Sequence, residues 1–475
     1  MPELRDLLQG RLALLHLKKA PIEIEDALRV ERTESMGRVM VANRDLSPGD
    51  IVLVERPVVA ASWKPELCLA CGARHEYTHC LEAAKLFPKA LVENLSVIES
   101  QILALDFDCF NGRDRLRSFI KLLWSPDLHS DVTRLVTANE QSCATAISTI
   151  RRDPVLHHVL PSSLSDGTCA QLLASLNTNC HDMPEWGGSG LFLRTLIIEH
   201  SCGPNACFTT AYPYLWVAMI EPVAEGERVS LDYHHAFYDP TPTRQEALLA
   251  GTFGFVCRCD RCLAPDDTRG FSCPRRGCPG PVYPPGVDSP ETSWHCMACE
   301  KTLSVEHVLR RLQAEQRASE ERGTKDIAWV DKIVGDRLLL ESHHLVWEVL
   351  LEVGTKLARR RRACLEGTAA AVWARVLRGV ARVYPPWHVE TIKFFEIQGQ
   401  ICVRQGRLRR AAKSFHRAWE ISRVCSGPTA WSTRTWLDLA TDPPRSDAEL
   451  QYRYAKAQHH GFIRQQCVLG NVISS

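Results

Sequence analysis

The sequence predicts an α+β protein in which two strand-rich segments are separated along the chain by helices. Short alternating apolar runs, typical of strands, occur over 27–57 and again over 190–233. Helical periodicity fills residues 81–180 and 303–475, and cysteines concentrate over 257–299. The length of 475 residues is enough for two or three domains.

The composition is that of an ordinary globular protein, with 45% hydrophobic and 24% charged residues. A formal net charge of +1 is too small to attract nucleic acid or an anionic membrane through the overall charge of the protein. No apolar run reaches the length of a transmembrane helix. The N-terminus carries charges from Glu3 onward, unlike a secretory signal. We therefore expect an intracellular protein, cytoplasmic or nuclear, whose 20 cysteines are metal ligands or buried thiols rather than disulfides.

The pattern of each segment predicts its structure in turn. Leucines at helical spacing predict an amphipathic helix at the N-terminus, and alternating apolar residues predict strands on either side of a Pro48-Gly49 turn. Strand signals return after a helical insert. In chain order, the predicted segments are a helix within 1–26, strands at 28–31, 38–42 and 51–55, a cysteine and histidine segment over 61–85, a helical insert over 86–180, strands at 215–220 and 229–233, a helix over 243–250, cysteine-rich loops over 257–302 and helices over 303–475.

Three short motifs occur in order within residues 199–262. They are EHSCGPN at 199–205, GERVSLDY at 226–233 and CRCDRC at 257–262. The first resembles the Asn-His-Ser-Cys-x-Pro-Asn loop of the SET domain of protein lysine methyltransferases. The second resembles the family's strand that begins Gly-Glu and ends in tyrosine, and the third its post-SET zinc motif.

The order of the segments resembles the SET-and-MYND family, in which a SET domain is interrupted by a zinc module and a helical insert. The resemblance implies a SET domain split between 27–60 and 181–256, a degenerate MYND-like segment over 61–85 and a helical C-terminal domain over 303–475. It also implies transfer of a methyl group from S-adenosylmethionine to a lysine of a protein substrate, histone or non-histone.

The resemblance assigns the site residues. Tyr233 matches the tyrosine whose hydroxyl orients the amine and the methyl group, although a tyrosine here could also simply pack in the core. The cofactor positions implied are Gly37, Arg38, Val39, Glu199, His200, Tyr233 and Phe255. The alternative for Phe255 is a core phenylalanine.

Three positions depart from the family pattern. Val39 stands where the family has the second glycine of Gly-x-Gly, and Glu199 where it has asparagine. Phe253 stands where some relatives carry a second channel tyrosine, which would alter how many methyl groups can be added. Asn205 matches the segment that closes the SET pseudoknot, so we expect a structural role for it.

Two zinc sites are expected, because zinc prefers four tetrahedral ligands. The Cys-x-Cys-x2-Cys motif supplies Cys257, Cys259 and Cys262, and the resemblance assigns the fourth ligand to Cys202. The alternative is three exposed cysteines in a loop. The second set has a ribbon-like spacing with no open position for catalysis, and consists of Cys273, Cys278, Cys296 and Cys299.

A third cysteine cluster lies where a MYND domain would begin. Only part of that module is present, so one zinc ion could bind Cys68, Cys71, His75 and Cys80, or the segment could be a remnant without metal. Peptide binding of the kind associated with intact MYND domains is not expected.

The C-terminal helices have two features of interest. Gly399, Ala411, Phe415 and Ala418 fall at the spacing of a tetratricopeptide repeat, although an ordinary helical bundle is the alternative. The basic run at 359–362 is either a solvated helix face or a signal for nuclear localisation or an acidic partner.

Two classes of function are therefore open. Tyr233 and His200 favour a lysine methyltransferase, whereas Val39 and Glu199 favour an inactive SET scaffold that binds partner proteins through its helical tail, or a transcriptional corepressor.

Overall fold

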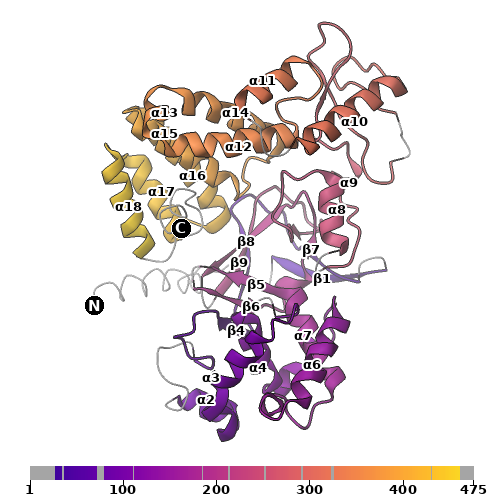
Figure 1. Ribbon diagram of the computed structural model, residues 1–475, viewed down its shortest axis with the longest axis vertical. Helices are drawn as coiled ribbons and strands as arrows, with labels where there is room; N and C mark the ends of the chain where they lie inside the picture. The colour runs from indigo at the N-terminus through magenta and orange to yellow at the C-terminus, as the bar shows by residue number, and fades with distance from the viewer. Residues whose placement is uncertain are drawn as a thin grey trace.

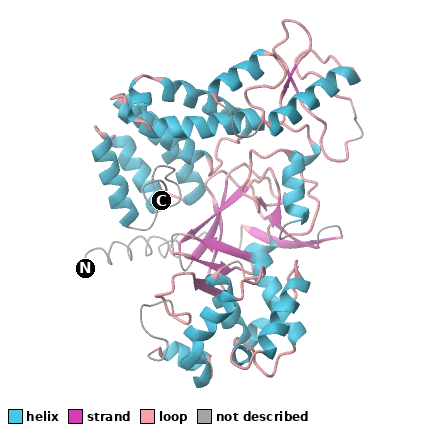
Figure 2. Ribbon diagram, viewed as in Figure 1, coloured by secondary structure: helices cyan, strands magenta, loops and turns pink. Residues whose placement is uncertain are grey.

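The computed structural model describes residues 27–459, except 35–36, 72–79, 111, 185, 212–213, 251–252, 290–292, 322–325 and 429. Most strands occupy the middle of the molecule, helices α2–α7 pack on one side of them, and helices α10–α18 lie on the other (Figures 1 and 2). The predicted N-terminal helix within 1–26 lies outside the described residues.

The strands of the central region bring together segments that are distant in the chain. Strands β1 (Leu28–Thr33) and β2 (Gly37–Ala42) form an antiparallel hairpin. Strand β2 also lies beside residues 226–229, since Met40 O accepts the Val229 N–H at 2.9 Å. Two three-stranded sheets have the orders β3-β9-β8 and β4-β6-β5. Their strands are β3 (Ile51–Glu55), β4 (Val59–Ser62), β5 (Cys180–Met183), β6 (Gly188–Leu191), β8 (Ala206–Ala211) and β9 (Tyr214–Met219).

The helical insert joins the two halves of this strand region. Its elements are α2 (Leu81–Leu86), α3 (Lys89–Ala104), α4 (Arg113–Leu123), α5 (Pro126–Val132), α6 (Glu140–Arg152), a 3-10 turn (Leu156–Val159) and α7 (Asp166–Asn179). Arg117 of α4 is 1% exposed, pairs with Glu99 of α3 at 3.0 Å, and donates to the carbonyls of Ser62, Lys64 and Leu67. This buried cation therefore fixes the insert to the end of β4.

The C-terminal region is helical, as predicted, and two of its helices cross closely. Its elements are α10 (Val305–Glu320), α11 (Ile327–Gly335), α12 (His344–Arg359), α13 (Arg361–Leu365), α14 (Thr368–Val383), α15 (Thr391–Arg404), α16 (Leu408–Ser426), α17 (Trp431–Thr441) and α18 (Asp447–His459). A Cβ on Gly399 would lie 2.5 Å from the Phe415 ring, so α15 and α16 can pack this closely only because residue 399 is glycine.

The basic run is on the surface. Arg359, Arg360 and Arg361 are exposed at the junction of α12 and α13, and Arg362 pairs with Glu366 at 2.6 Å. Within the described residues, every helix is too short or too polar to span a lipid bilayer.

Candidate functional site

A short parallel strand pair builds the centre of the site. In this pair, β7 (Glu199–His200) lies beside β10 (Ser230–Leu231), and the Ser201 N–H donates to Leu231 O at 2.9 Å. Asn205, in the loop after β7, donates to Arg228 O and accepts the Ser230 N–H, each at 2.8 Å. Its side-chain amide thus holds the two crossing segments together, the structural role expected for it.

The His200 side chain is positioned by both of its ring nitrogens. Nδ1 accepts the backbone N–H of Tyr233 at 3.1 Å, and Nε2 lies 3.3 Å from Cys202 Sγ. Because Nδ1 is an acceptor, the neutral ring carries its proton on Nε2 and donates it to the sulfur. The ring therefore links the first cysteine cluster to the strand end that carries Tyr233, and we assign it to positioning.

Tyr233 has its hydroxyl held and its ring packed. The hydroxyl donates to the carbonyl of Ile198. The ring centroid lies 5.2 Å from that of His200 and 5.2 Å from that of Phe253. Burial, with a smaller contribution from Glu199, raises the pKa of Tyr233 above its ordinary value. The phenol is therefore protonated at neutral pH.

Phe255 completes an aromatic group around His200. Its ring centroid lies 5.8 Å from that of His200 and 6.4 Å from that of Phe253. Since Phe255 is only half-buried, one part of its ring remains open to a ligand. A phenylalanine at 253 also leaves Tyr233 as the hydroxyl-bearing member of this aromatic group.

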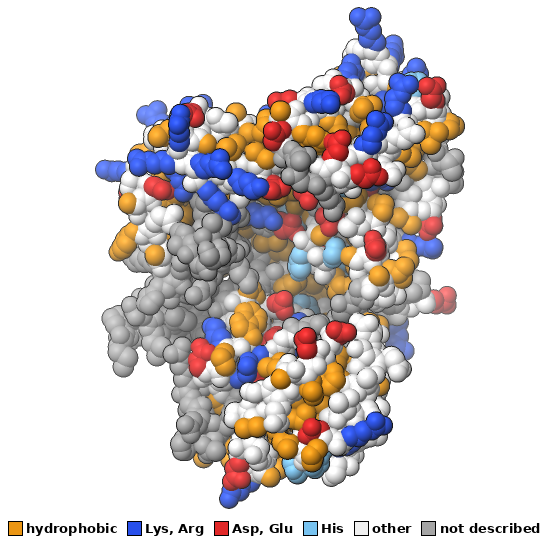
Figure 3. All heavy atoms as spheres, in the orientation of Figure 1, with side chains coloured by type: hydrophobic (Ala, Val, Ile, Leu, Met, Phe, Trp, Pro, Cys, Tyr) orange, Lys and Arg blue, Asp and Glu red, His pale blue; other side chains and the backbone are white. Residues whose placement is uncertain are grey.

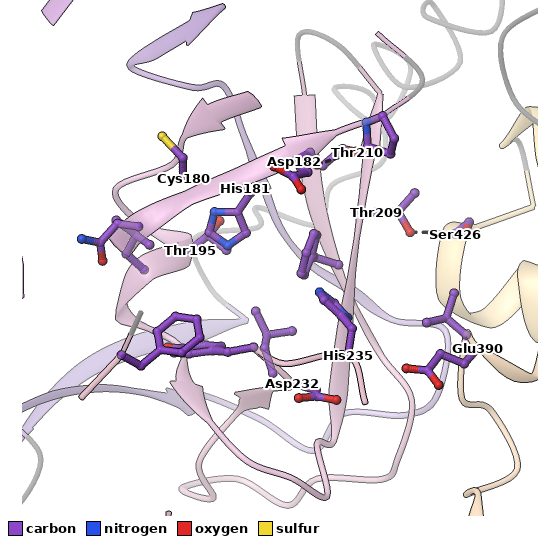
Figure 4. Close-up of a pocket in the computed structure, with 18 of the residues that line it drawn as sticks. Cys180, His181, Asp182, Thr195, Thr209, Thr210, Asp232, His235, Glu390 and Ser426 are labelled. Atoms are coloured by element: carbon purple, nitrogen blue, oxygen red, sulfur yellow. Dashed lines mark hydrogen bonds between the residues drawn. The ribbon is translucent and has the colours of Figure 1, made fainter. Parts of the chain in front are cut away.

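A cavity of about 700 Å³ opens beside Tyr233 and Phe253. Its lining comes from three parts of the chain: the strand region, the end of the insert and the C-terminal helices. Figure 4 shows His181 and Asp182 of β5, Thr209 and Thr210 of β8, and Asp232, His235, Glu390 and Ser426 around the same space. The surface is hollowed between the insert and the C-terminal helices, where histidine and acidic side chains are visible (Figure 3).

The proposed cofactor positions fall into two groups. Glu199 and His200 adjoin Tyr233 through the strand pair, whereas Gly37 and Arg38 are exposed near the end of the β1–β2 hairpin. Gly37 has φ +73°, a conformation that favours glycine. Val39, where the family has glycine, is 1% exposed and forms part of the packed interior.

The carboxylate of Glu199 is paired within the protein. Its Oε1 lies 3.3 Å from the guanidinium of Arg228. The backbone of Arg228 forms an antiparallel β-bridge with Val41 of β2. Burial raises the pKa of Glu199 above its ordinary value, and Arg228 opposes that effect. With glutamate at position 199 in place of asparagine, the loop after β7 therefore has an ion pair beside it rather than a lone carboxylate.

The first predicted cysteine set converges. The sulfurs of Cys202, Cys257, Cys259 and Cys262 all lie within 4.8 Å of one another. Gln245 holds the backbone of Cys257 with two hydrogen bonds of 2.8 Å. Four converging thiols that form no disulfide are the donor set that zinc prefers, so the residues fit a structural zinc ion.

The second set converges in the same way, within 4.8 Å, in the loops that carry strands β11 (Phe271–Ser272) and β12 (Pro281–Val282). Backbone N–H groups of Arg275, Gly280 and Ala298 point at the sulfurs of Cys273, Cys278 and Cys296, at 3.4–3.5 Å. Such donors stabilise thiolates. A Cβ on Gly280 would lie 2.5 Å from Cys296 Sγ, so the loop is shaped around the cluster.

The third cluster is present in part. Cys68, Cys71 and Cys80 offer sulfurs within 4.8 Å of one another, and Cys80 also caps α2 by accepting the Ala83 N–H at 3.3 Å. The fourth predicted ligand, His75, lies outside the described residues.

Sequence reasoning missed most of the cavity wall. Asp232 could have been found from its place next to Tyr233, but Glu390 and Lys393 lie just before and within α15, in a region without local motifs. His181 and Asp182 belong to β5, which the sequence did not predict as a strand.

Comparison with known proteins identifies the central region. The SET domain family profile matches residues 37–234. The chain is 25% identical to the histone-lysine N-methyltransferase ASHR1 of Arabidopsis thaliana over 283 residues, which are 56% of this chain and 57% of that protein. It is 33% identical to the protein-lysine N-trimethyltransferase SMYD5 of Homo sapiens over 85 residues, which are 17% of this chain and 20% of that protein.

Two further comparisons are weaker. The chain is 27% identical to the SET domain-containing protein SmydA-8 of Drosophila melanogaster over 146 residues, 28% of this chain and 31% of that protein. A crystal structure of the SET domain of LSMT bound to lysine and AdoHcy aligns over 100% of this chain and 98% of its own, with 12% identity and a TM-score of 0.29, too low to support a conclusion. The chain thus spans little more than half of ASHR1 and smaller parts of the other relatives. Residues 37–234 therefore match the SET domain, and SET-and-MYND proteins are among the relatives to which the chain is similar.

Proposed function

We propose that the protein is an S-adenosylmethionine-dependent protein-lysine N-methyltransferase. The observation that carries this proposal is the protonated hydroxyl of Tyr233, held by the Ile198 carbonyl on a residue that lines a cavity. Two relatives are named lysine methyltransferases, which supports the same activity here.

The hydrogen bonding of Tyr233 suits the positioning of an amine. Because the hydroxyl donates its proton to Ile198 O, its oxygen can act only as an acceptor toward an incoming N–H. An amine that donates to this oxygen has its lone pair directed elsewhere, and placing it in line with the methyl group lowers the entropic part of the barrier. The Nζ–C bond then forms as the C–S bond breaks, the sulfur keeps the electron pair, and the ammonium product loses a proton to water.

Residues on the other side of Tyr233 suit the methyl donor. The open part of the Phe255 ring offers an apolar surface for adenine, and the Glu199–Arg228 pair offers opposite charges for the donor's ammonium and carboxylate groups. When bound, S-adenosylmethionine supplies an electrophilic methyl group. Because Glu199 is already paired, its presence in place of asparagine does not require repulsion of the donor's carboxylate.

The first cysteine cluster supports this site indirectly. Cys202 belongs to both the cluster and the loop that carries His200, and the His200 ring holds the backbone of Tyr233. A zinc ion on these thiols would fix that loop, so its role would be structural, since four thiolates leave no open position for chemistry.

The test is transfer of a labelled methyl group to a peptide library by the native protein and by Tyr233→Phe. The variant removes one hydroxyl, and we expect a loss of about 100-fold in kcat/KM with little change in affinity for the methyl donor, because the amine loses its positioning. Tyr454→Phe is a matched control, since Tyr454 is also buried and hydrogen-bonded, in α18. Equal activity of native protein and Tyr233→Phe would refute the role of Tyr233, and absence of transfer despite donor binding would favour the scaffold.

A further inference from the structure

A cluster of two carboxylates and a histidine lies beside the cavity, away from the cysteine clusters. Asp232, His388 and Glu390 each offer a ligand atom within 4.8 Å of the other two. Asp232 directly precedes Tyr233, whereas His388 and Glu390 lie before α15 in the C-terminal helical region. Figure 4 shows the carboxylates of Asp232 and Glu390 at the same end of the cavity.

Two atoms of this cluster are buried without a hydrogen-bond partner in the described part of the chain. They are Glu390 Oε1 and His388 Nδ1. The other Glu390 oxygen accepts from the Tyr384 hydroxyl at 2.8 Å, and His388 is only 4% exposed. Burying such groups without partners costs free energy, so these two atoms are available to the N–H donors of a ligand.

The chemistry of these atoms selects the ligand. Burial lowers the pKa of His388 to about 3, so its imidazole is neutral and can offer a lone pair. Carboxylate oxygens and a neutral imidazole nitrogen are acceptors, and a guanidinium or ammonium group supplies several N–H donors together with the opposite charge.

Neighbouring cations do not already fill this role. Arg115 pairs with Asp182 at 3.1 Å on another wall of the cavity. Lys393 also lines the cavity and opposes the rise that burial causes in the pKa of Glu390, but its ammonium lies 5.1 Å from the Phe394 ring centroid and, among the described residues, forms no ion pair with either carboxylate of the cluster.

Arg261 adds to the effect of burial in lowering the pKa of His388, but its guanidinium lies 3.6 Å from the Phe237 ring centroid and donates to the carbonyls of Cys202 and Phe237. The cluster therefore carries an excess of negative charge when both carboxylates are ionised. Because burial raises the pKa of Glu390 to about 7, a bound cation would favour the ionised form, and the binding tests belong at about pH 8.

We propose that Asp232, His388 and Glu390 form a subsite for a cationic side chain, arginine above all, that lies close in sequence to the lysine presented to Tyr233. This proposal rests on the proposed function and names the substrate class of the same site. Because Asp232 and Tyr233 are neighbours and line one cavity, a peptide could place two side chains into it at once. An extended peptide advances about 3.3 Å per residue, so the cation belongs about one to three residues from the target lysine.

The test compares arginine with citrulline, which has nearly the same shape and no charge. The probes are Gly/Ser/Ala dodecapeptides with one central lysine and one arginine or citrulline at a position one to three residues away. Peptide binding is measured by fluorescence anisotropy, and methylation by label transfer. With native protein we expect at least tenfold preference for arginine at one or more positions, in binding and in kcat/KM. Glu390→Gln and Asp232→Asn should each reduce this preference to less than threefold.

Asp182→Asn is the matched control, because Asp182 lines the same cavity but is paired with Arg115. It should keep the preference. If Glu390→Gln fails to fold, Asp232→Asn decides the test. Methylation without any preference for arginine over citrulline would overturn the subsite while leaving the proposed function intact. Arginine-selective binding without methylation would support the subsite and count against the enzyme. One more divalent ion per chain in native protein than in Glu390→Gln, counted by mass spectrometry under native conditions, would show that the cluster holds a metal, and would also overturn the proposal.

Discussion

The carboxyl group of Glu390 makes the stability of the fold depend on pH in a direction opposite to that of an ordinary ion-paired acid. Burial raises the pKa of Glu390 from 4.5 to about 7, while Lys393 and the Tyr384 hydroxyl oppose the effect and Asp232 and Asp239 add to it. The folded protein therefore binds a proton that the unfolded chain has released by neutral pH.

The direction and size of this pH dependence follow from the difference between the pKa of Glu390 in the folded protein and its pKa in the unfolded chain. A raised carboxyl pKa contributes stability that is fully present below the unfolded value of 4.5 and is lost as pH rises through about 7. At about 1.4 kcal/mol for each pKa unit, the difference corresponds to about 3 kcal/mol. Raising the pH from 5 to 8 should therefore lower the free energy of unfolding by roughly this amount through Glu390 alone.

The assay is urea unfolding of native protein and Glu390→Gln at intervals from pH 5 to pH 8. Glutamine can still accept the Tyr384 hydrogen bond but does not titrate, so other pH effects cancel in the difference between the two proteins. We expect the variant to gain about 3 kcal/mol relative to native protein between pH 5 and pH 8. Parallel pH profiles for the two proteins would refute the burial argument.

Three further predictions concern packing and metal. Arg117→Met should lower the free energy of unfolding by about 3–5 kcal/mol in denaturant titrations, because it removes the fully buried one of the two arginines that pair with Glu99 and the donor shared by three backbone carbonyls; a loss under 1 kcal/mol would contradict the ion-pair assignment. Gly399→Val should cost about 1–3 kcal/mol or more through the Phe415 ring, and an unchanged melting temperature would rule out the close crossing of α15 and α16. Cys296→Ser should remove close to one zinc ion per chain by mass spectrometry, and an unchanged zinc content would exclude the second site.

Local sequence patterns were sufficient for elements whose structure depends on near neighbours. The strand expected at 51–55 is β3, and the four cysteines expected in the ribbon-like site converge as their spacing predicts. Gly399 and Phe415 also meet where the helical periodicity places them, because a close helix crossing requires a small residue at a fixed offset. The strand predicted at 229–233 is shorter in the structure, since only Ser230–Leu231 pairs with β7 before Asp232 and Tyr233 turn toward the cavity.

The cavity could not be predicted in the same way. Glu390 reaches Asp232 only because the C-terminal helices pack against the strand region, a contact with no local signal in the sequence. The same holds for His200, whose motif predicts a ligand contact but does not show that both ring nitrogens have partners within the protein. The role of each side chain depends on tertiary contacts, which the motif does not encode.

The most direct test of the account is calorimetric titration of the zinc-loaded protein with S-adenosylmethionine and with its demethylated product. We predict binding of both near the micromolar range, about −8 kcal/mol, because the Glu199–Arg228 pair and the open ring of Phe255 provide the required contacts. No detectable binding to a folded sample with its zinc in place would contradict the methyltransferase and make the scaffold the better explanation.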